Sequence, residues 1–361
     1  MPHRPQESPP RQPYLPPEGT AGSPRRPHAV LAISRAVREA LLDHAALRRL
    51  RRVAHVDPEL LISSPADFTG PRHTARLATA EALFTCWGCP PLTAQALALM
   101  PRLRTVVHAA GSVKEHITEA CWERGLTVSC AAAANALPVA EYTVAAILFS
   151  GKRILEFARA YRAGRTPPDG LVGRADLGNY RRTVGVVGAS RVGRRVIELL
   201  RPFDLRVLVY DPYLPGDAAR RLGAEPVELD ELARRSDIVT LHAPALPHTR
   251  HLFDRARLAL LPDGATLINT ARGCLVDTEA LTEELVRGRL YAVLDHTEPE
   301  VPPAGSPLYE LPNVLLTPHV AGSLGNELGR LAHAAIDELE RYAAGLPYAQ
   351  PVTRGILTHS A

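Results

Sequence analysis

Long apolar runs are absent from this sequence of 361 residues. No run approaches the roughly 18 apolar residues that a membrane-spanning helix needs, so we expect no membrane partner. Cysteine is also scarce, with five residues, and the chain shows no signal-peptide pattern. A small, odd number of cysteines in a long chain favours a reducing compartment. We therefore expect a cytoplasmic protein.

An excess of one charge is absent too. Lysine and arginine total 42 against 38 aspartates and glutamates, which gives a net charge of +4, and the two signs are interspersed. A strong basic patch is the usual footprint of nucleic-acid binding, so we expect no nucleic-acid partner. Only Lys114 and Lys152 are lysines. Because the arginines are spread along the chain, the preference for arginine over lysine says little about function.

Proline is concentrated at the start of the chain. Residues 1–27 hold many prolines and too few apolar side chains to offset the entropy of ordering them, which predicts a disordered tail. The remainder is long enough to bury two cores of ordinary size. Within it, short apolar runs alternate with amphipathic helical stretches. The predicted strands lie at 29–33, 82–86, 105–109, 126–130, 183–187, 206–210, 238–241, 266–269, 292–294 and 314–316.

This alternation of strands and helices occurs twice, so it predicts an α/β chain with two doubly wound parallel sheets. A long apolar helix at 138–153, with Pro138 in its first turn, is expected to precede the second set of strands. Another long helix, at about 324–342, follows the final strand directly. We expect it to return to the first unit, which makes that domain discontinuous.

A glycine-rich turn follows the predicted strand at 183–187. Gly188 permits a tight reversal, and the helix that begins near Gly193 presents free N–H groups to a pyrophosphate. Ser190 takes the middle position, where its hydroxyl can itself donate to phosphate. Asp211 ends the next strand, 18 residues beyond Gly193, and its carboxylate suits ribose hydroxyls and repels a 2′-phosphate. The pattern favours NAD over NADP, against the alternative of a structural turn with a capping aspartate.

Three polar residues, Arg272, Glu300 and His319, each follow one of the last three predicted strands. In a doubly wound sheet, such strand ends line the crevice in which ligands bind. An arginine can hold a carboxylate through two parallel hydrogen bonds, and a histidine exchanges a proton near neutral pH. A carboxylate beside that histidine stabilises the imidazolium. The set suits reduction of a small 2-keto acid by a nicotinamide cofactor.

Each of these residues also has an ordinary interpretation when it is taken alone. Arg272 suits a surface turn, Glu300 a solvated loop and His319 the end of a strand; the ordered set indicates the chemistry. Cys86 and Cys89 have the spacing of a redox or metal pair, but no second ligand pair is spaced for zinc. We interpret them as part of a loop, with reversible oxidation as the alternative, and we expect no metal.

The sequence resembles the D-isomer-specific 2-hydroxy-acid dehydrogenases, the family that includes phosphoglycerate dehydrogenase and glyoxylate/hydroxypyruvate reductase. The resemblance covers about residues 80–345. It rests on the segments 184–193, 241–244, 269–273, 294–300 and 311–319 and on Asp211, with weaker support from 110–111 and 139–143.

The resemblance implies a fold with a flavodoxin-like substrate domain and an NAD-binding Rossmann domain. The implied parts are the substrate (catalytic) domain at 28–133 and 320–346, the NAD-binding domain at 134–319 and a C-terminal tail at 347–361. It also implies a homodimer formed through the nucleotide domain, to which the helix at 138–153 is suited. Relatives that act as NAD(H)-sensing corepressors provide an alternative function, a binding protein rather than an enzyme.

The resemblance further implies roles for individual residues. Arg272 binds substrate and polarises its carbonyl, His319 is the acid/base, and Glu300 is its partner. Main-chain N–H groups near Ser112 and Val113 hold the substrate carboxylate. The implied NAD-binding residues are Gly188, Ser190, Arg191, Val192, Gly193, Asp211, Thr270, Ala271 and Asp295.

The chain also departs from the family pattern in three places. Ser190 replaces the usual middle glycine, and His296 with Thr297 stand where valine and phenylalanine are common. The loop at 111–115 lacks the usual second glycine. None of these departures identifies a particular 2-hydroxy acid or the physiological direction.

Overall fold

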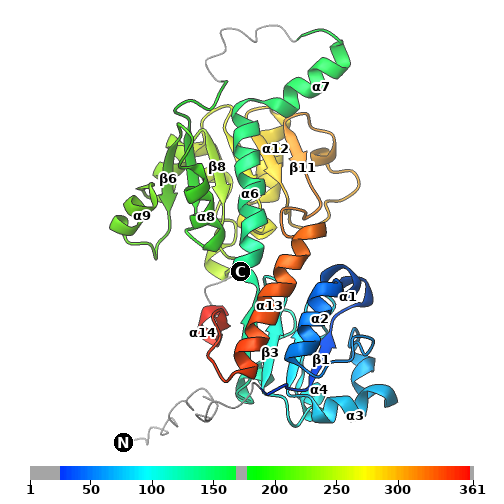
Figure 1. The fold of residues 1–361 in the computed structure, drawn as a ribbon. Helices are drawn as coiled ribbons and strands as arrows, with labels where there is room; N and C mark the ends of the chain where they lie inside the picture. Colours follow the sequence, from blue (N-terminus) through cyan, green and yellow to red (C-terminus); the bar gives the residue numbers. More distant parts are fainter. Residues whose placement is uncertain (1–24, 168–176, 358–361) are drawn as a thin grey trace, which may run out of the picture. The chain divides into compact units, whose positions relative to one another are not determined.

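The computed structural model describes residues 25–167 and 177–357. Most of the predicted N-terminal tail, up to residue 24, lies outside the described residues. The chain divides into two compact units, and the first boundary between them falls within helix α6 (Ala132–Gly151; Figure 1). Among the described residues, unit 1 comprises 25–134 and 325–354, and unit 2 comprises the rest.

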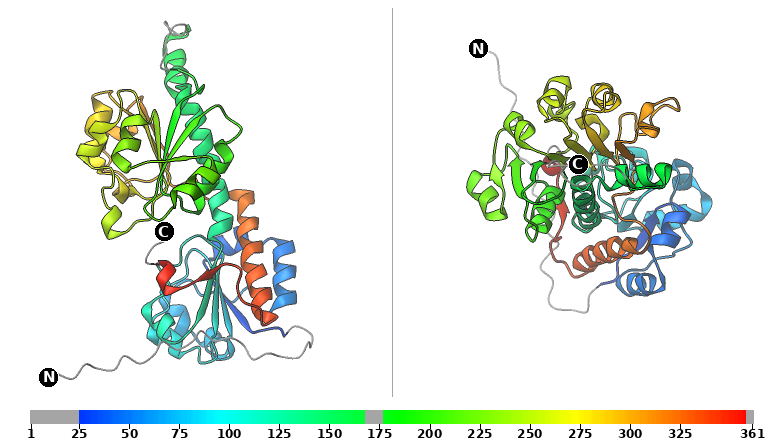
Figure 2. Two further views of the ribbon diagram at one scale, coloured as in Figure 1. Left: turned by 90° about the vertical axis from the view of Figure 1, so that its left-hand side faces the viewer. Right: turned by 90° about the horizontal axis from the view of Figure 1, so that it is seen from above.

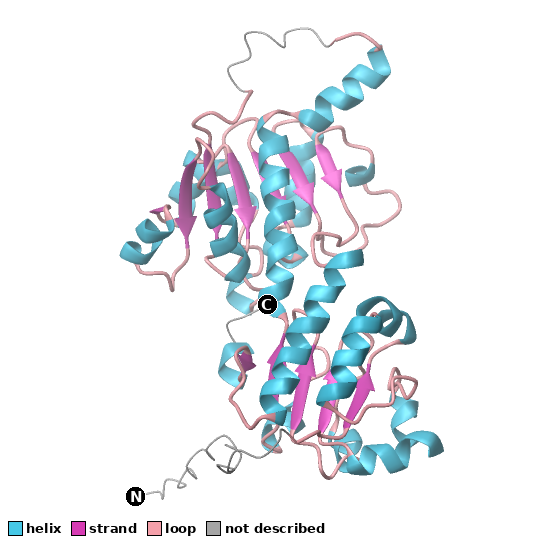
Figure 3. Cartoon of the chain, viewed as in Figure 1, coloured by secondary structure: helices cyan, strands magenta, loops and turns pink. Residues whose placement is uncertain are grey.

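Unit 1 contains a five-stranded sheet in the order β1-β2-β3-β4-β12 (Figure 3). The first four strands are parallel, and β12 pairs antiparallel with β4. We expected residues 347–361 to form a C-terminal tail. This expectation is wrong for residues 351–352, which add an edge strand to the sheet. This strand was not predicted, because two residues, the first of them proline, are too few to show the alternation of apolar and polar side chains that marks a strand. The strands are β1 (Ala29–Ala32), β2 (Ala82–Thr85), β3 (Thr105–His108), β4 (Thr127–Cys130) and β12 (Pro351–Val352).

One face of this sheet is covered by α1, α2 and α13. Phe84 and Leu31 on the strands pack in one buried cluster with Leu50 of α2 and Ile336 of α13. Helix α13 thus returns to unit 1, as the sequence predicts, although it begins 198 residues after the last residue of β4 and 296 residues after that of β1. The helices of unit 1 are α1 (Arg35–Leu41), α2 (His44–Val53), α3 (Pro71–Thr79), α4 (Ala94–Ala98), α5 (Glu119–Glu123) and α13 (Leu328–Ala343).

Unit 2 contains a seven-stranded parallel sheet in the order β11-β10-β9-β8-β5-β6-β7. Strand β5 comes first in the chain and lies between β8 and β6. The strand order reverses on the two sides of β5, and ligands of doubly wound sheets bind at such a switch point. The strands are β5 (Thr183–Val187), β6 (Arg206–Tyr210), β7 (Glu225–Pro226), β8 (Ile238–Leu241), β9 (Thr266–Asn269), β10 (Tyr291–Leu294) and β11 (Val314–Leu316).

Helices cover both faces of this sheet, which Figure 2 shows edge-on in its left view. Side chains of α6, α8 and α9 form one buried cluster with one face of the strands. Side chains of α10, α11 and α12 form a second cluster with the other face. Burial on both faces explains why these strands read as continuous apolar runs. The remaining helices are α6 (Ala132–Gly151), α7 (Ile154–Gly164), α8 (Arg191–Leu200), α9 (Gly216–Leu222), α10 (Leu229–Arg235), α11 (Arg255–Leu260), α12 (Thr278–Val286) and α14 (Arg354–Leu357).

Helix α6 differs from its prediction. It begins at Ala132, so Pro138 lies inside the helix instead of in its first turn. Alanine is the strongest helix former, and the alanines before Pro138 extend the helix toward its start. The helix is also long and apolar enough, by length and composition alone, to cross a membrane, although the sequence contains no uninterrupted apolar run of that length. Since Ala140 and Ile147 pack in the core of unit 2, we interpret α6 as a core helix.

Buried histidines make the stability of both units sensitive to acid. Burial lowers the pKa of His242 in unit 2 to about 3 and that of His116 in unit 1 to about 4, and it holds the pKa of His108 well below its usual value. In the unfolded chain each histidine titrates near pH ~6.5. The unfolded state therefore binds more protons below that pH, and the free energy of unfolding falls as the pH decreases from about 6.5 toward 4.

We expect each of these histidines to contribute a slope of about 1.4 kcal/mol per pH unit in this range. Urea unfolding at several pH values measures the slope, and His242→Gln should make it shallower for unit 2. An unfolding free energy that stays constant from neutral pH to about pH 5 would contradict the buried, neutral state of these side chains.

Candidate active site

The turn between β5 and α8 requires its two glycines. Gly188 has φ +94°, and a Cβ atom there would lie 2.7 Å from the backbone nitrogen of Ala243. A Cβ atom on Gly193 would lie 2.0 Å from the carbonyl oxygen of Gly188. Only glycine allows the first turn of α8 to approach the end of β5 this closely. The helix N-terminus is therefore held at the switch point of the sheet.

Ser190 occupies the middle position of this turn without strain. Its φ of −63° and ψ of −180° are extended values that any residue adopts, and its hydroxyl accepts a hydrogen bond from the N–H of Gly193. The departure from glycine therefore keeps the turn and adds a helix cap. The N–H groups of Arg191 and Val192, in the first turn of α8, have no acceptor within the helix. The turn thus fits a diphosphate group, as the predicted roles of these residues require.

Asp211 follows β6 and lies beside the glycine turn. One carboxylate oxygen accepts a hydrogen bond from the N–H of Ala189 at 2.6 Å, and the other accepts one from the N–H of Tyr213 at 2.8 Å. These contacts fix the carboxylate, and each of its oxygens can accept a further hydrogen bond. The position fits the predicted contact with ribose hydroxyls.

The structure brings His319 and Glu300 into direct contact within unit 2. The Nδ1 atom of His319 lies 2.7 Å from Oε1 of Glu300. Both side chains are exposed, by 53% and 65%. The hydrogen bond with His319 holds the pKa of Glu300 below its usual value, and the positive charge of Arg272 lowers it further. The three residues predicted as catalytic are thus close enough to act on one another electrostatically.

A network beneath His319 fixes the loop that carries it. The buried carboxylate of Asp295, at the end of β10, accepts hydrogen bonds from the N–H groups of Val320 at 2.8 Å and Ala321 at 2.9 Å. It also accepts one from the hydroxyl of Thr317 at 2.6 Å. His319 itself has φ +55°, a value that L residues adopt only where the surroundings impose it. Asp295, predicted beside the nicotinamide, is therefore also a positioning residue for His319.

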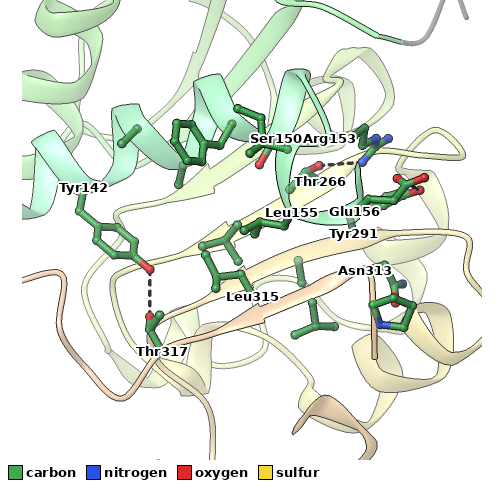
Figure 4. Close-up of a pocket in the computed structure, with 18 residues that line it drawn as sticks. Tyr142, Ser150, Arg153, Leu155, Glu156, Thr266, Tyr291, Asn313, Leu315 and Thr317 are labelled. Atoms are coloured by element: carbon green, nitrogen blue, oxygen red, sulfur yellow. Dashed lines mark hydrogen bonds between the residues drawn. The ribbon is translucent and has the colours of Figure 1, made fainter. Parts of the chain in front are cut away.

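Tyr142 of α6 extends this network, a role that the sequence did not reveal. Its hydroxyl lies 2.9 Å from that of Thr317, at one end of an apolar cavity of about 220 Å³ between α6–α7 and β10–β11 (Figure 4). Because Thr317 donates its proton to Asp295, Tyr142 is the donor to Thr317. Helix α6 is thereby connected to the His319 loop through one hydrogen bond and to Asp295 through a second.

Asp295→Asn should lower kcat by about tenfold to a hundredfold, because an amide cannot accept all three hydrogen bonds and the His319 loop loses its fixed position. The expected loss is mainly in kcat. Asp237→Asn is the matched control, since that carboxylate also accepts a backbone N–H, from Thr183, in the same unit. Equal losses of kcat in the two variants would contradict a positioning role for Asp295.

Arg272 is placed by two neighbours that sequence reasoning did not single out. The buried side-chain amide of Asn269 donates to the carbonyl oxygens of Arg272 at 2.9 Å and His296 at 3.4 Å. A Cβ atom on Gly273 would lie 2.1 Å from the backbone of Thr297. The loops after β9 and β10 are therefore packed backbone to backbone, which keeps the Arg272 loop beside the segment that leads to Glu300.

His296 contacts the ring of His319. The two ring centroids lie 3.8 Å apart in an edge-to-face arrangement, and His296 is buried. Burial lowers the pKa of His296 to about 4, and the positive charges of His319 and Arg272 act in the same direction. The imidazole of His296 is therefore uncharged at neutral pH. His296, which departs from the family pattern, thus contacts the predicted acid/base residue directly.

The other predicted site residues occupy both units. In unit 2, Thr270 is buried with its hydroxyl 3.1 Å from that of Thr143, and Ala271 follows it toward Arg272. Ser112 and Val113 lie in unit 1, in the loop after β3, where Val113 is buried and Ser112 half-buried.

The cysteine pair of unit 1 shows no sign of reactivity. Both Cys86 and Cys89 are free thiols, and burial raises the pKa of each to about 12. A thiol attacks as its thiolate, so burial disfavours the reactive form of both side chains near neutral pH. This agrees with the interpretation of the pair as part of a loop.

Comparisons with known proteins give the family. Residues 144–321 match the model of the D-isomer specific 2-hydroxyacid dehydrogenase NAD binding domain. A hydroxypyruvate reductase of Thermotoga maritima is 30% identical over 251 residues, which cover 69% of this chain and 80% of that protein. A D-3-phosphoglycerate dehydrogenase of Methanocaldococcus jannaschii is 34% identical over 223 residues, which cover 62% of this chain and 42% of that protein.

A solved structure has the same fold. The TT0316 protein from Thermus thermophilus superposes with a TM-score of 0.71 at 31% identity, covering 90% of this chain and 99% of that chain. The chain belongs to the D-isomer specific 2-hydroxyacid dehydrogenase family, and unit 2 contains its NAD binding domain. It spans about half the length of the phosphoglycerate dehydrogenases it matches.

Proposed function

We propose that this protein is an NAD-dependent oxidoreductase that interconverts a small 2-keto acid and the corresponding D-2-hydroxy acid. The observation that carries the proposal is the 2.7 Å contact of His319 with Glu300, in the same unit as Arg272 and the glycine turn. These groups provide a proton donor, its partner, a cation for a carboxylate and a place for a diphosphate. A binding protein has no need of the first two, so the corepressor alternative is not favoured.

Each residue has its own role in the reduction. His319 gives a proton to the oxygen at C2, and Glu300 stabilises the imidazolium before transfer. Arg272 holds the substrate carboxylate and polarises the carbonyl. Asp211 and the first turn of α8 would hold NAD, which supplies or accepts the hydride when bound. In oxidation His319 takes the proton back.

Oxidation of NADH by a panel of 2-keto acids tests the function. The panel contains glyoxylate, hydroxypyruvate, pyruvate and phosphohydroxypyruvate, each also measured with NADPH. We expect turnover with at least one acid and a preference for NADH, because Asp211 repels the 2′-phosphate. Inactivity on every acid, together with NADH-dependent capture of a protein partner, would favour the corepressor alternative instead.

We also propose that the protein is a homodimer in the cytoplasm. Helices α6 and α7 expose the large apolar side chains of Phe149, Ile154 and Tyr161, and the first two of these line the apolar cavity described above. Exposed apolar side chains around such a cavity are typical of an interface. The five free cysteines fit a reducing compartment. Sedimentation velocity measures the mass in solution, and cell fractionation tests the location.

A further inference from the structure

Three potential metal ligands converge at the site. One ligand atom from each of His296, Glu300 and His319 lies within 4.8 Å of the other two. Two imidazoles and one glutamate form a ligand set that binds zinc in enzymes, with the fourth position left to water. The set contains no thiol and only one carboxylate, so it suits Zn²⁺ or Co²⁺ better than Mg²⁺ or Ca²⁺, which prefer oxygen ligands.

The distances allow a metal with small side-chain movements. Ligand atoms about 2.0–2.2 Å from a tetrahedral zinc lie about 3.4 Å from one another. Glu300 and His319 are exposed by 65% and 53%, so their side chains can move, and their 2.7 Å contact can lengthen to this separation. His296 is the fixed member, because it is buried and its ring contacts that of His319.

The charges around the three ligands are mixed. The carboxylates of Glu300 and Asp295 favour a cation, and the guanidinium of Arg272 opposes it.

We propose that His296, Glu300 and His319 form a binding site for a divalent transition metal of the zinc type, and that an ion there inhibits the enzyme. A metal bound to both His319 and Glu300 replaces the contact between them and occupies the groups that the proposed reaction needs for proton transfer. The binding part of this inference stands by itself, whereas the inhibition part rests on the proposed function. His296 is the residue that distinguishes the site from a histidine–glutamate pair alone.

Co²⁺ is the first probe, because its visible absorption reports tetrahedral coordination by nitrogen and oxygen without any turnover. We expect the unmodified protein to give this absorption and Zn²⁺ to displace it, while Mg²⁺ does not. His296→Val should weaken Zn²⁺ binding, measured by calorimetry, by at least about tenfold, since even the loss of a group supporting a ligand costs that much. The matched control is His251→Gln, because His251 also lies near a glutamate, Glu298, at 3.8 Å.

The results of these experiments test metal binding and inhibition separately. Equal Zn²⁺ affinity in His296→Val and the unmodified protein, or no Co²⁺ absorption at all, would overturn the site. Zn²⁺ binding that leaves NADH oxidation unchanged would overturn the inhibition. If no 2-keto acid is reduced, the proposed function fails, but the Co²⁺ spectrum and the calorimetry still decide whether the metal binds.

Discussion

His319→Ala should lower kcat by about 10²–10⁴-fold, the usual contribution of a positioned acid/base, and leave the dissociation constant of NADH nearly unchanged. The reason is geometric. His319 is half-exposed at the end of β11 and lies 2.7 Å from Glu300, whereas the glycine turn and Asp211 are carried by β5, α8 and β6. Removing the imidazole therefore removes the proton donor without altering the residues that would hold NAD.

Glu300→Gln is the companion variant, because it keeps the size of the side chain and removes its charge. We expect a smaller loss of kcat than in His319→Ala, since the imidazole remains but its protonated form is less stabilised. Stopped-flow turnover and NADH fluorescence titration measure the two effects separately. Full turnover in His319→Ala would remove this residue from the mechanism.

Gly188→Ala should abolish NADH binding. A methyl group there meets the backbone of Ala243 at 2.7 Å, and the residue must keep φ +94°. The expected loss of stability is about 1–3 kcal/mol from the backbone conformation, and relief of the overlap displaces the turn that faces the diphosphate.

Gly288→Ala provides a matched control for this prediction. Gly288 also has a positive φ, of +72°, but a Cβ atom there would meet no atom within 4 Å. Both variants should therefore lose stability, and only Gly188→Ala should lose NADH binding. Calorimetric titration with NADH, together with thermal unfolding of each variant, measures both quantities. Normal NADH affinity in Gly188→Ala would contradict the placement of the diphosphate at this turn.

The strands were predictable because most of them are buried on both faces. Strands β5, β6, β8, β9 and β11 have the predicted bounds, since a continuous apolar run between polar turns leaves little choice of ends. Strands β7 and β12 have two residues each and include a proline, so no periodicity reveals them. The predicted start of α6 is wrong because proline favours the first turn of a helix, whereas in this helix the alanines before Pro138 extend it back to Ala132.

The part of the candidate site that was predictable consists of residues whose side-chain type itself indicates a chemical role. Arg272, Glu300 and His319 follow strand ends, and the sheet topology brings strand ends together. The hydrogen bonds of Tyr142, Asn269 and Asp295 described above were not predictable, because all but the one from Asn269 to Arg272 join residues at least 22 positions apart in the sequence. His296 was visible as a departure from the family pattern, but its contact with the His319 ring is set by how the loops after β10 and β11 pack.

The most direct test of the account follows deuterium from NADH labelled at C4 into the product. With the best 2-keto acid of the panel, the account predicts that deuterium appears at C2 of the hydroxy acid, that none is exchanged with solvent, and that the product has the D configuration. Product that lacks deuterium at C2, or that has the L configuration, would contradict the assignment of this chain as a D-2-hydroxy-acid dehydrogenase.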